Sequence, residues 1–397
     1  MSIKDTVAIV GMGCSRFGER WDCGVADLAI ESSQEAYADS GLEPKDIEAV
    51  FLGQMYAPAG GLGGSQVSDA LKMKGVPVVR NENNCTAGHV ALISACMAVA
   101  SGAYTTAMAM GVEKLKDTGF PGLGTGRGMN PVLEARRTAP GSFALIGTRY
   151  FEEYGIAYDE GRELLARIAV KNHKNGMLAP RAHFHKEISV EDVLKAPMIA
   201  SPLGLFDCCG NSDGSACAII TRADRARSLR PDPIYIKGFG MGMDPMLPQN
   251  RPGFSWTSFE SLRLSSSKAY EMAGVRNPRE EIDIAEVHDC FTITELAIYE
   301  DFGFSPRGKA KDDIRSGFFE RDGGLPVNVD GGLKCFGHPV GASGIRMTYE
   351  IYKQLQGKVD NPARQIPNVR LGLSHTFGGA PQISAVLICG NEKDRTI

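Results

Sequence analysis

The sequence predicts an α/β fold, because strands and helices alternate along almost the whole chain. Short apolar runs recur, and most are followed by a segment whose apolar residues have helical spacing. The order of a polar or glycine-rich turn, a helix and a strand occurs twice, once around Cys85 and once around His338. We therefore expect mostly parallel sheet and infer an internal duplication.

The first half opens with an apolar strand over 6–10 that runs into Gly11 and Gly13. A dinucleotide fingerprint needs a third glycine where Arg16 stands, so we reject a Rossmann cofactor site. The helix expected over 86–101 has no polar face and must be buried on all sides. The other elements expected in this half are helices over 24–40 and 64–73 and strands over 47–52, 105–112 and 214–221.

Between these strands, residues 114–202 are rich in Gly, Pro and Arg, with helical pieces such as 159–173. This stretch is typical of an insertion lying over a core. The second half repeats the earlier pattern, and a glycine-rich turn over 331–344 leads into its last helix. Its expected elements are strands over 234–240, 282–287, 369–374 and 383–389 and helices over 259–273, 292–302 and 345–355.

The size and charge of the chain exclude several classes of protein. Its 397 residues predict two or three units of structure at roughly 100–200 residues each. The net charge of −4 argues against a dedicated nucleic-acid protein. No apolar run approaches the ~18 residues that a membrane span needs. The N-terminus has no secretion signal, so we expect a cytoplasmic protein that does not bind membranes.

The chain has ten cysteines, and no two of them form a CxxC pair. A zinc site built by this chain is therefore not expected, and in a reducing compartment the cysteines are thiols. His183 and His185 lack a third ligand and are interpreted as loop histidines. Most of the cysteines are interpreted as small buried apolar residues.

Cys85 is an exception, because it stands where a strand turns into the buried helix. Free backbone N–H groups and the positive end of the helix dipole face such a side chain, and both lower the pKa of a thiol. The same N–H groups could stabilise an oxyanion formed when the thiolate attacks a carbonyl. Cys85 is therefore a candidate nucleophile.

Three further motifs carry polar residues at the ends of strands. His288, Asp289 and Cys290 follow the strand over 282–287, at the kind of strand end where α/β proteins place their sites. His338 stands between glycines, which leave its ring open to a ligand. The segment 374–379 is a strand that runs into a glycine turn.

Taken together, these motifs resemble the thiolase superfamily, and specifically its sterol-carrier-protein-type branch, which includes acetyl-CoA acetyltransferase-like proteins. The HDCF string at 288–291 and the GHPVGASG string at 337–344 carry the resemblance, which covers nearly the whole chain. It implies a five-layer αβαβα sandwich of two similar halves with an inserted loop domain. The implied boundaries are 1–113 with 203–228 for the first half, 114–202 for the loop domain and 229–397 for the second half.

The resemblance also implies a role for each site residue. Cys85 would carry the acyl group, His338 would accept its thiol proton, and His288 would help to stabilise the thioester oxygen with a water. Cys290 would be the acid/base at the α-carbon. The backbone N–H groups of Cys85, Gly378 and Gly379 would form a second oxyanion hole. The chain departs from most thiolases at His375, which stands where they place a second catalytic cysteine.

The expected activity is that of a thiolase, which forms or cleaves a 3-oxoacyl-CoA with coenzyme A as co-substrate and no metal or tightly bound cofactor. A retro-aldolase and a non-catalytic thioester-binding subunit remain alternatives. Cys85 argues against the first, and the presence of Cys85, His288, Cys290 and His338 together argues against the second. The resemblance implies a homodimer or tetramer, with a small zinc-ribbon/OB-fold protein as a further partner. The substrate stays open between acetoacetyl-CoA and a bulky, aromatic or carboxylated 3-oxoacyl-CoA. Candidate CoA contacts are Arg136, Arg137 and Arg149, and candidate substrate loops are 119–140 and 243–256.

Overall fold

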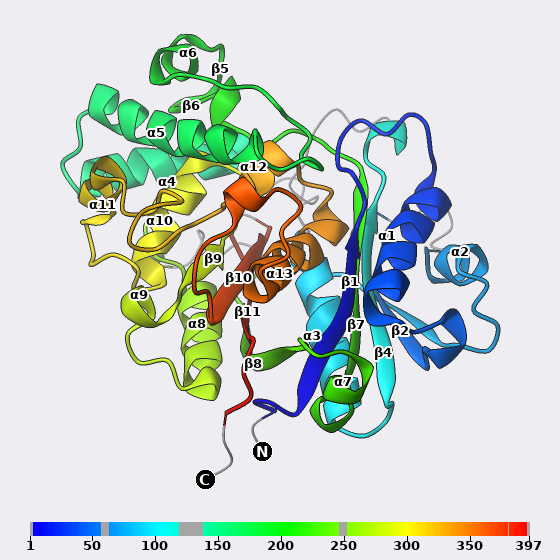
Figure 1. The fold of residues 1–397 in the computed structure, drawn as a ribbon. Coiled ribbons are helices and arrows are strands. Elements are labelled where there is room, and N and C mark those ends of the chain that lie inside the picture. Colours follow the sequence, from blue (N-terminus) through cyan, green and yellow to red (C-terminus); the bar gives the residue numbers. More distant parts are fainter. Residues whose placement is uncertain (1–2, 57–62, 119–137, 246–251, 380, 395–397) are drawn as a thin grey trace.

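A computed structural model describes residues 3–56, 63–118, 138–245, 252–379 and 381–394 as a mixed α/β protein (Figure 1). Its strands are β1 Val7–Cys14, β2 Ala49–Gly53, β3 Val78–Asn81, β4 Thr106–Glu113, β5 Met198–Ala200, β6 Leu203–Gly204, β7 Gly214–Arg222, β8 Ile234–Met243, β9 Ile284–Glu286, β10 Leu371–Gly378 and β11 Ile383–Gly390. Its α-helices are α1 Val25–Ser40, α2 Gly63–Ala70, α3 Ala87–Ala100, α4 Ala139–Glu153, α5 Tyr158–Gly176, α6 Val190–Lys195, α7 Ala223–Leu229, α8 Glu260–Ala273, α9 Pro278–Glu281, α10 Thr292–Asp301, α11 Ala310–Ser316, α12 Gly332–Phe336 and α13 Val340–Gln356. Short 3₁₀ turns lie at Pro44–Asp46, Lys116–Thr118, Leu205–Asp207 and Pro362–Arg364.

The large sheet contains the same pattern of strands twice. Its order is β3-β2-β4-β7-β1-β8-β11-β10-β9. In the first half β1 pairs with β7 and β7 with β4, both antiparallel, whereas β4 pairs with β2 in parallel. In the second half β8, β11, β10 and β9 repeat this sequence of pairing directions. The internal duplication is therefore confirmed.

Helices α3 and α13 form the middle layer of the molecule. They pack against each other, and α13 contacts strands of both halves, including β4 and β10. Helix α1 covers the outer side of the first half and α8 that of the second, so the layers run helix, sheet, helix, sheet, helix. Figure 1 shows α13 between β10 on one side and β1 on the other. The predicted five-layer sandwich is confirmed.

The glycines that imitate a dinucleotide fingerprint serve helix packing instead. A Cβ at Gly11 or Gly13 would overlap the backbone of α1, and a Cβ at Gly240 or Gly242 would overlap the backbone of α8 in the same way. The first strand of each half thus lets its helix approach closely. This duplicated role explains the glycines without a bound nucleotide.

The expectation of a mostly parallel sheet was wrong. Of the eight pairings in the large sheet, five are antiparallel and three are parallel. Strands β10 and β11 are joined by a short turn, and such a turn can connect only antiparallel neighbours. In the first half, β7 follows the long segment after β4 instead of a single crossover helix. The alternation of elements alone does not reveal either connection.

The last long helix begins earlier than the sequence predicts. Helix α13 starts at Val340 instead of residue 345, and the preceding stretch contains the short helix α12. Gly341 and Gly344 therefore lie inside a helix, where they allow close packing. Helices α4 to α6 with β5 and β6 occupy 139–204, and the proposed domain boundaries stay predictions. In the described part of the chain, no helix is long and apolar enough to cross a membrane.

Candidate active site

The duplication places Cys85 and His338 at equivalent positions. Cys85 lies two residues before α3, and His338 lies two residues before α13. The two helices meet near their N-termini, where a Cβ at Gly88 would lie 2.6 Å from the carbonyl oxygen of Gly341. A Cβ at Gly344 would likewise lie 2.6 Å from the backbone nitrogen of His89. Small residues thus bring both helix starts to the same end of the middle layer.

The turn before α3 holds Cys85 beside the glycine turn after β10. Asn84 has a left-handed backbone with φ of 52°, and the N–H of Ala87 donates to its carbonyl at 3.1 Å. A Cβ at Gly378 would lie 2.6 Å from the carbonyl oxygen of Asn83, and the next residue, Gly379, has a φ of 73°. The residues expected to form the second oxyanion hole are therefore close together in space.

The hydrogen bonds of His338 define its tautomer. Its Nδ1 lies 2.7 Å from the Oγ of Ser343, and the hydroxyl of Ser343 donates to the carbonyl of Pro339 at 3.0 Å. A serine hydroxyl has one hydrogen, so the Ser343 oxygen must accept from Nδ1–H. The Nε2 of His338 is then an unprotonated nitrogen, and it is buried without a hydrogen-bond partner. That atom can accept a proton.

Two more buried imidazoles lie beside His338. The ring of His288, which follows β9, is 5.3 Å from that of His338 between centroids, and the ring of His375 is 6.4 Å from that of His288. Burial lowers the pKa of His338 to about 3 and the pKa of His288 and His375 well below the usual value. All three rings are therefore neutral near pH 7. Neither ring nitrogen of His375 has a hydrogen-bond partner.

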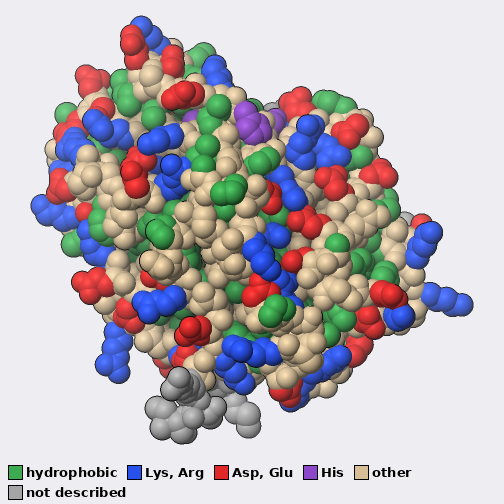
Figure 2. All heavy atoms as spheres, viewed as in Figure 1, with side chains coloured by type: hydrophobic (Ala, Val, Ile, Leu, Met, Phe, Trp, Pro, Cys, Tyr) green, Lys and Arg blue, Asp and Glu red, His purple; other side chains and the backbone are tan. Residues whose placement is uncertain are grey.

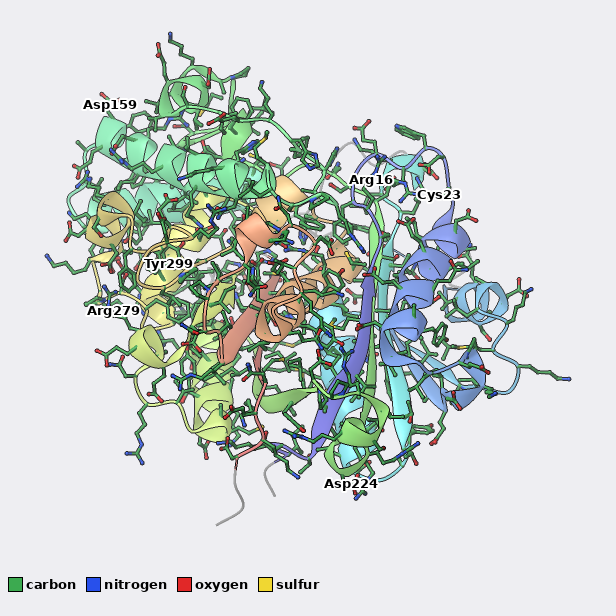
Figure 3. The ribbon with its side chains drawn as sticks, in the orientation of Figure 1. Arg16, Cys23, Asp159, Asp224, Arg279 and Tyr299 are labelled. Carbon is green, nitrogen blue, oxygen red and sulfur yellow. The ribbon has the colours of Figure 1, made fainter. Side chains whose placement is uncertain are left out.

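Three thiols of the site, Cys85, Cys209 and Cys290, are close enough to affect one another. Burial raises the pKa of Cys290 well above its usual value, and the neighbouring Cys209 and Cys85 add to the rise. The N–H of Cys209 donates to the carbonyl of Cys290 at 2.9 Å, and the Sγ of Cys290 lies 3.9 Å from the Oγ1 of Thr294. The sequence interpretation missed Cys209. By contrast, Cys23 lies at the start of α1, away from α12 and α13 (Figure 3).

The expected lowering of the Cys85 pKa was wrong. Burial raises the pKa of this thiol to about 12, and the carboxylate of Glu113 adds to the rise, whereas the residue's own N–H works in the opposite direction. The neighbouring thiols and Asp289 add to the raised pKa of Cys290 in the same way. Burial is the largest cause at both thiols, and at Cys85 it outweighs the effect of the residue's own N–H. Both are neutral near pH 7 in the free protein.

Two buried carboxylates hold the loops of the site. Glu113 accepts the N–H groups of Met55 at 2.9 Å, Tyr56 at 3.0 Å and Gly341 at 3.0 Å, and burial raises its pKa to about 7. Asp289 accepts the N–H of Leu333 at 2.6 Å, at the start of α12. Asp289 stands inside a motif that the sequence singled out, but only the structure assigns either residue this role.

The candidate CoA contacts and substrate loops are mostly outside the described residues. The structure does not describe residues 119–137, which include Arg136 and Arg137, or residues 246–251. Arg149, by contrast, pairs with Glu152 on the surface. His183 and His185 are the histidines that are not buried, and Figure 2 shows histidine surface between the α5–α6 region and the α1 region. The Nδ1 of His183 is hydrogen-bonded to the Oγ of Ser212 at 2.8 Å, and the Nε2 of His185 to the carbonyl of Ala179 at 2.9 Å. Across the described ranges, no group of three or more His, Cys, Asp and Glu side chains could hold a metal ion.

A duplicated five-layer fold with neutral imidazoles and thiols at the meeting point of its two central helices is typical of acyltransferases that act on thioesters. Family profiles agree: the thiolase N-terminal domain matches residues 7–224 and the thiolase C-terminal domain-like family matches residues 252–391. The chain therefore belongs to the thiolase family, and it is an acyltransferase of the thiolase type.

Individual relatives place it within the family. It is 35% identical to an acetyl-CoA acetyltransferase of Methanothermobacter thermautotrophicus, over 96% of this chain and 98% of the relative. It is 29% identical to sterol carrier protein 2 of Gallus gallus, over 94% of this chain and 69% of that protein. Among solved structures, the Ltp2-ChsH2(DUF35) aldolase is 26% identical with a TM-score of 0.85, and each chain is covered completely. These similarities support the sterol-carrier-protein-type branch.

Proposed function

We propose that this chain cleaves or forms a 3-oxoacyl-CoA through an acyl group carried on Cys85, with coenzyme A as co-substrate. The observation that carries the proposal is the free Nε2 of His338, which the bond from Nδ1–H to Ser343 leaves able to accept a proton. A neutral thiol beside a neutral imidazole reacts by passing its proton as its sulfur attacks. Transfer of the proton during the attack suits these groups, because burial disfavours their charged forms.

In the cleavage direction, the sulfur of Cys85 attacks the 3-oxo carbonyl while its proton moves to His338. The N–H groups of Cys85, Gly378 and Gly379 stabilise the resulting oxyanion. The bond between the α- and β-carbons then breaks, and the thiol of Cys290 protonates the enolate of the leaving acetyl-CoA. His288, together with a water, stabilises the thioester oxygen of that enolate.

In the second half of the reaction, coenzyme A attacks the acyl group on Cys85 and releases a shortened acyl-CoA. His338 returns its proton to the thiolate of Cys290, then accepts the proton of the attacking thiol and passes it to the leaving sulfur of Cys85. Atoms and protons therefore balance over one cycle. In the biosynthetic direction the same groups act in reverse, and Cys290 removes the α-carbon proton.

Cys290→Ala separates these steps. We expect this variant to keep the exchange of label between acetyl-CoA and coenzyme A, which needs Cys85 and His338, and to lose C–C bond cleavage by more than about 100-fold. Cys389→Ala, which removes a buried thiol from β11, is the matched control and keeps both reactions. Equal loss of both reactions in Cys290→Ala would remove Cys290 from the acid/base role.

A retro-aldolase acting on the side chain of a CoA thioester is the second candidate, favoured by the similarity to the Ltp2-ChsH2(DUF35) aldolase. The same similarity supports a small zinc-ribbon/OB-fold partner, and a non-catalytic subunit of such a complex is the third candidate. The proposal includes a cytoplasmic homodimer or tetramer. A panel of 3-oxoacyl and 3-hydroxyacyl thioesters, read by mass spectrometry, distinguishes the candidates: a thiolase consumes coenzyme A, an aldolase does not, and a non-catalytic subunit turns over neither.

A further inference from the structure

A buried carboxylate that the proposed mechanism does not use joins three parts of the chain. Glu295, in the first turn of α10, is completely buried. Its Oε2 accepts from the side-chain amides of Asn172, in α5, and Asn328, in the loop before α12, each at 2.8 Å. Its Oε1 pairs with the ammonium of Lys171 at 2.8 Å and accepts from the hydroxyl of Tyr299. Helix α5 is thereby fixed to α10 and to this loop.

The two asparagines also hold the residues on either side of His288. The Nδ2 of Asn172 donates to the Oδ2 of Asp289 at 2.8 Å. On the other side, the backbone N–H of Val287 donates to the Oδ1 of Asn328 at 2.8 Å. Residues 287 and 289 are therefore each linked to the same buried carboxylate through one asparagine amide, and His288 stands between them.

The amide of Asn172 is oriented by its two acceptors, and this orientation is unfavourable for its own oxygen. Carboxylates of ionised side chains only accept hydrogen bonds, so Nδ2 must face both of them. The Oδ1 of Asn172 is then buried, and among the described residues it has no hydrogen-bond partner. Burial and the charge of Glu295 also raise the pKa of Asp289 to about 7, so the approach of the two carboxylates is unfavourable as well. Buried arrangements with such local costs are typical of functional sites.

The ring of His288 depends on its backbone for its position. Its Nδ1 is buried and finds no hydrogen-bond partner within the described residues. The contacts of the ring are with other rings, those of His338, Phe377 and His375, at 5.3, 6.3 and 6.4 Å between centroids. Packing of this kind restrains a ring less specifically than a hydrogen bond at each nitrogen does. The residues that hold the backbone on both sides therefore contribute to the placement of the imidazole.

We propose that Asn172 and Asn328, joined through Glu295, are positioning residues that hold the imidazole of His288 where the enolate of the leaving thioester forms. This inference rests on the proposed function and adds to it a set of three residues, the asparagine clamp. The clamp acts through His288, so it supports the step that breaks the bond between the α- and β-carbons. The exchange of acyl groups between Cys85 and coenzyme A does not use His288 and is expected to be independent of the clamp.

The first test is Asn172→Ala, read with the 3-oxoacyl thioester that the wild-type protein cleaves fastest. We expect kcat for cleavage to fall by about 10–100-fold, the usual effect of losing the partner that orients a histidine, with KM little changed. The exchange of label between acetyl-CoA and coenzyme A should stay close to the wild-type rate. Asp289 keeps its bonds to the N–H groups of Leu333 and Lys334, so the start of α12 remains held.

Asn391→Ala is the matched control. Asn391 follows β11, and its Nδ2 also donates to two acceptors, the carbonyls of Leu355 at 3.2 Å and Val369 at 3.0 Å. Its Oδ1, like that of Asn172, is buried, and the described residues supply no partner for it. The control should therefore lose a similar amount of stability while it keeps the wild-type ratio of cleavage to exchange. Both reactions are measured on one sample, so a partly unfolded protein lowers both and leaves their ratio unchanged.

A double variant tests whether Asn172 acts through His288. When His288→Ala has already removed the imidazole, adding Asn172→Ala should lower cleavage no further, because there is no ring left to position. Asn328→Asp is a second variant of the clamp. It keeps an oxygen for the N–H of Val287 and tolerates the left-handed backbone, with φ of 55°, but it has no amide to donate to Glu295. It should show the same selective loss of cleavage.

Equal losses of cleavage and exchange in Asn172→Ala would overturn the inference, as would a wild-type ratio of the two reactions. Additive losses in the double variant would overturn it too, since Asn172 would then act on another group. If Asn172→Ala does not fold, the ratio measured for Asn328→Asp decides in the same way. If the wild-type protein never acylates Cys85 and cleaves no 3-oxoacyl thioester with coenzyme A, the proposed function itself fails, and the inference fails with it.

Discussion

The Nδ1–H of His338 donates to the Oγ of Ser343 at 2.7 Å, and this one contact determines which nitrogen of the ring can act as a base. The hydroxyl of Ser343 cannot donate in return, because it already donates to the carbonyl of Pro339. A serine five residues after a histidine, in the first turn of α13, thus prepares the imidazole for proton transfer before substrate arrives.

Ser343→Ala removes the acceptor that selects this tautomer. We expect the rate of Cys85 acylation to fall by about 10–100-fold, the usual effect of losing the partner that orients a histidine. The melting temperature should change little more than in Ser266→Ala, whose buried hydroxyl donates to its own helix at 3.3 Å. Acylation kinetics measured by quenched mass spectrometry check this expectation. Unchanged kinetics in Ser343→Ala would mean that the tautomer is set elsewhere.

The raised pKa of Cys85 predicts the pH dependence of its alkylation. Burial raises this pKa to about 12, so the thiolate is a minor species at neutral pH and its fraction grows with pH. The rate of iodoacetamide labelling at Cys85 should rise about tenfold per pH unit between about pH 7 and pH 9 without a plateau. Peptide mapping separates Cys85 from the other nine thiols. A plateau near pH 7 would instead reveal a preformed thiolate–imidazolium pair.

Glu113 should suppress this labelling only where it is charged. Its pKa is about 7, and its charge raises the pKa of Cys85. Glu113→Gln should therefore be labelled faster than the wild-type protein above about pH 7 and equally fast well below it. Glu43→Gln, at an exposed turn, is the control and should match the wild-type protein throughout. Parallel profiles for Glu113→Gln and the wild-type protein at every pH would contradict this electrostatic coupling.

The meeting point of α3 and α13 should not tolerate a side chain. A Cβ at Gly341 would lie 2.6 Å from the carbonyl oxygen of Gly53 and 3.0 Å from the carboxylate of Glu113. Gly341→Ala should lower the free energy of unfolding by about 1–3 kcal/mol and impair acylation, because it displaces the start of α13 from the end of β2 and from Glu113. In Gly64→Ala, by contrast, the nearest contact is 3.4 Å, and denaturant unfolding should show no loss of stability. Equal stability of the two variants would contradict the close contact.

The sequence was informative about elements and motifs and less so about their connections. Apolar periodicity located α1, α3 and most strands within a few residues, because burial on one or all sides leaves a local pattern. The antiparallel pairing of β11 with β8 depends on contacts between residues far apart in the chain, which leave no local pattern. For the same reason, motif strings identified Cys85 and His338 but not the position of Cys209 beside Cys290.

The pKa values of the site residues could not be predicted from the sequence for a similar reason. A cysteine at a helix start predicts a lowered pKa, yet Cys85 is half-buried near a carboxylate and its pKa rises. Burial depends on everything packed around a side chain, so it cannot be read from the residue's own segment.

The central claim is that Cys85 carries the acyl group, and one measurement tests it most directly. The protein is incubated with acetyl-CoA, quenched in acid, digested and mapped by mass spectrometry. The account predicts one acetyl group on the peptide that contains Cys85, its absence in Cys85→Ala, and its release by added coenzyme A. An acetyl group on Cys209 or Cys290 instead, or an unmodified Cys85 in a protein that still cleaves 3-oxoacyl-CoA, would contradict the account.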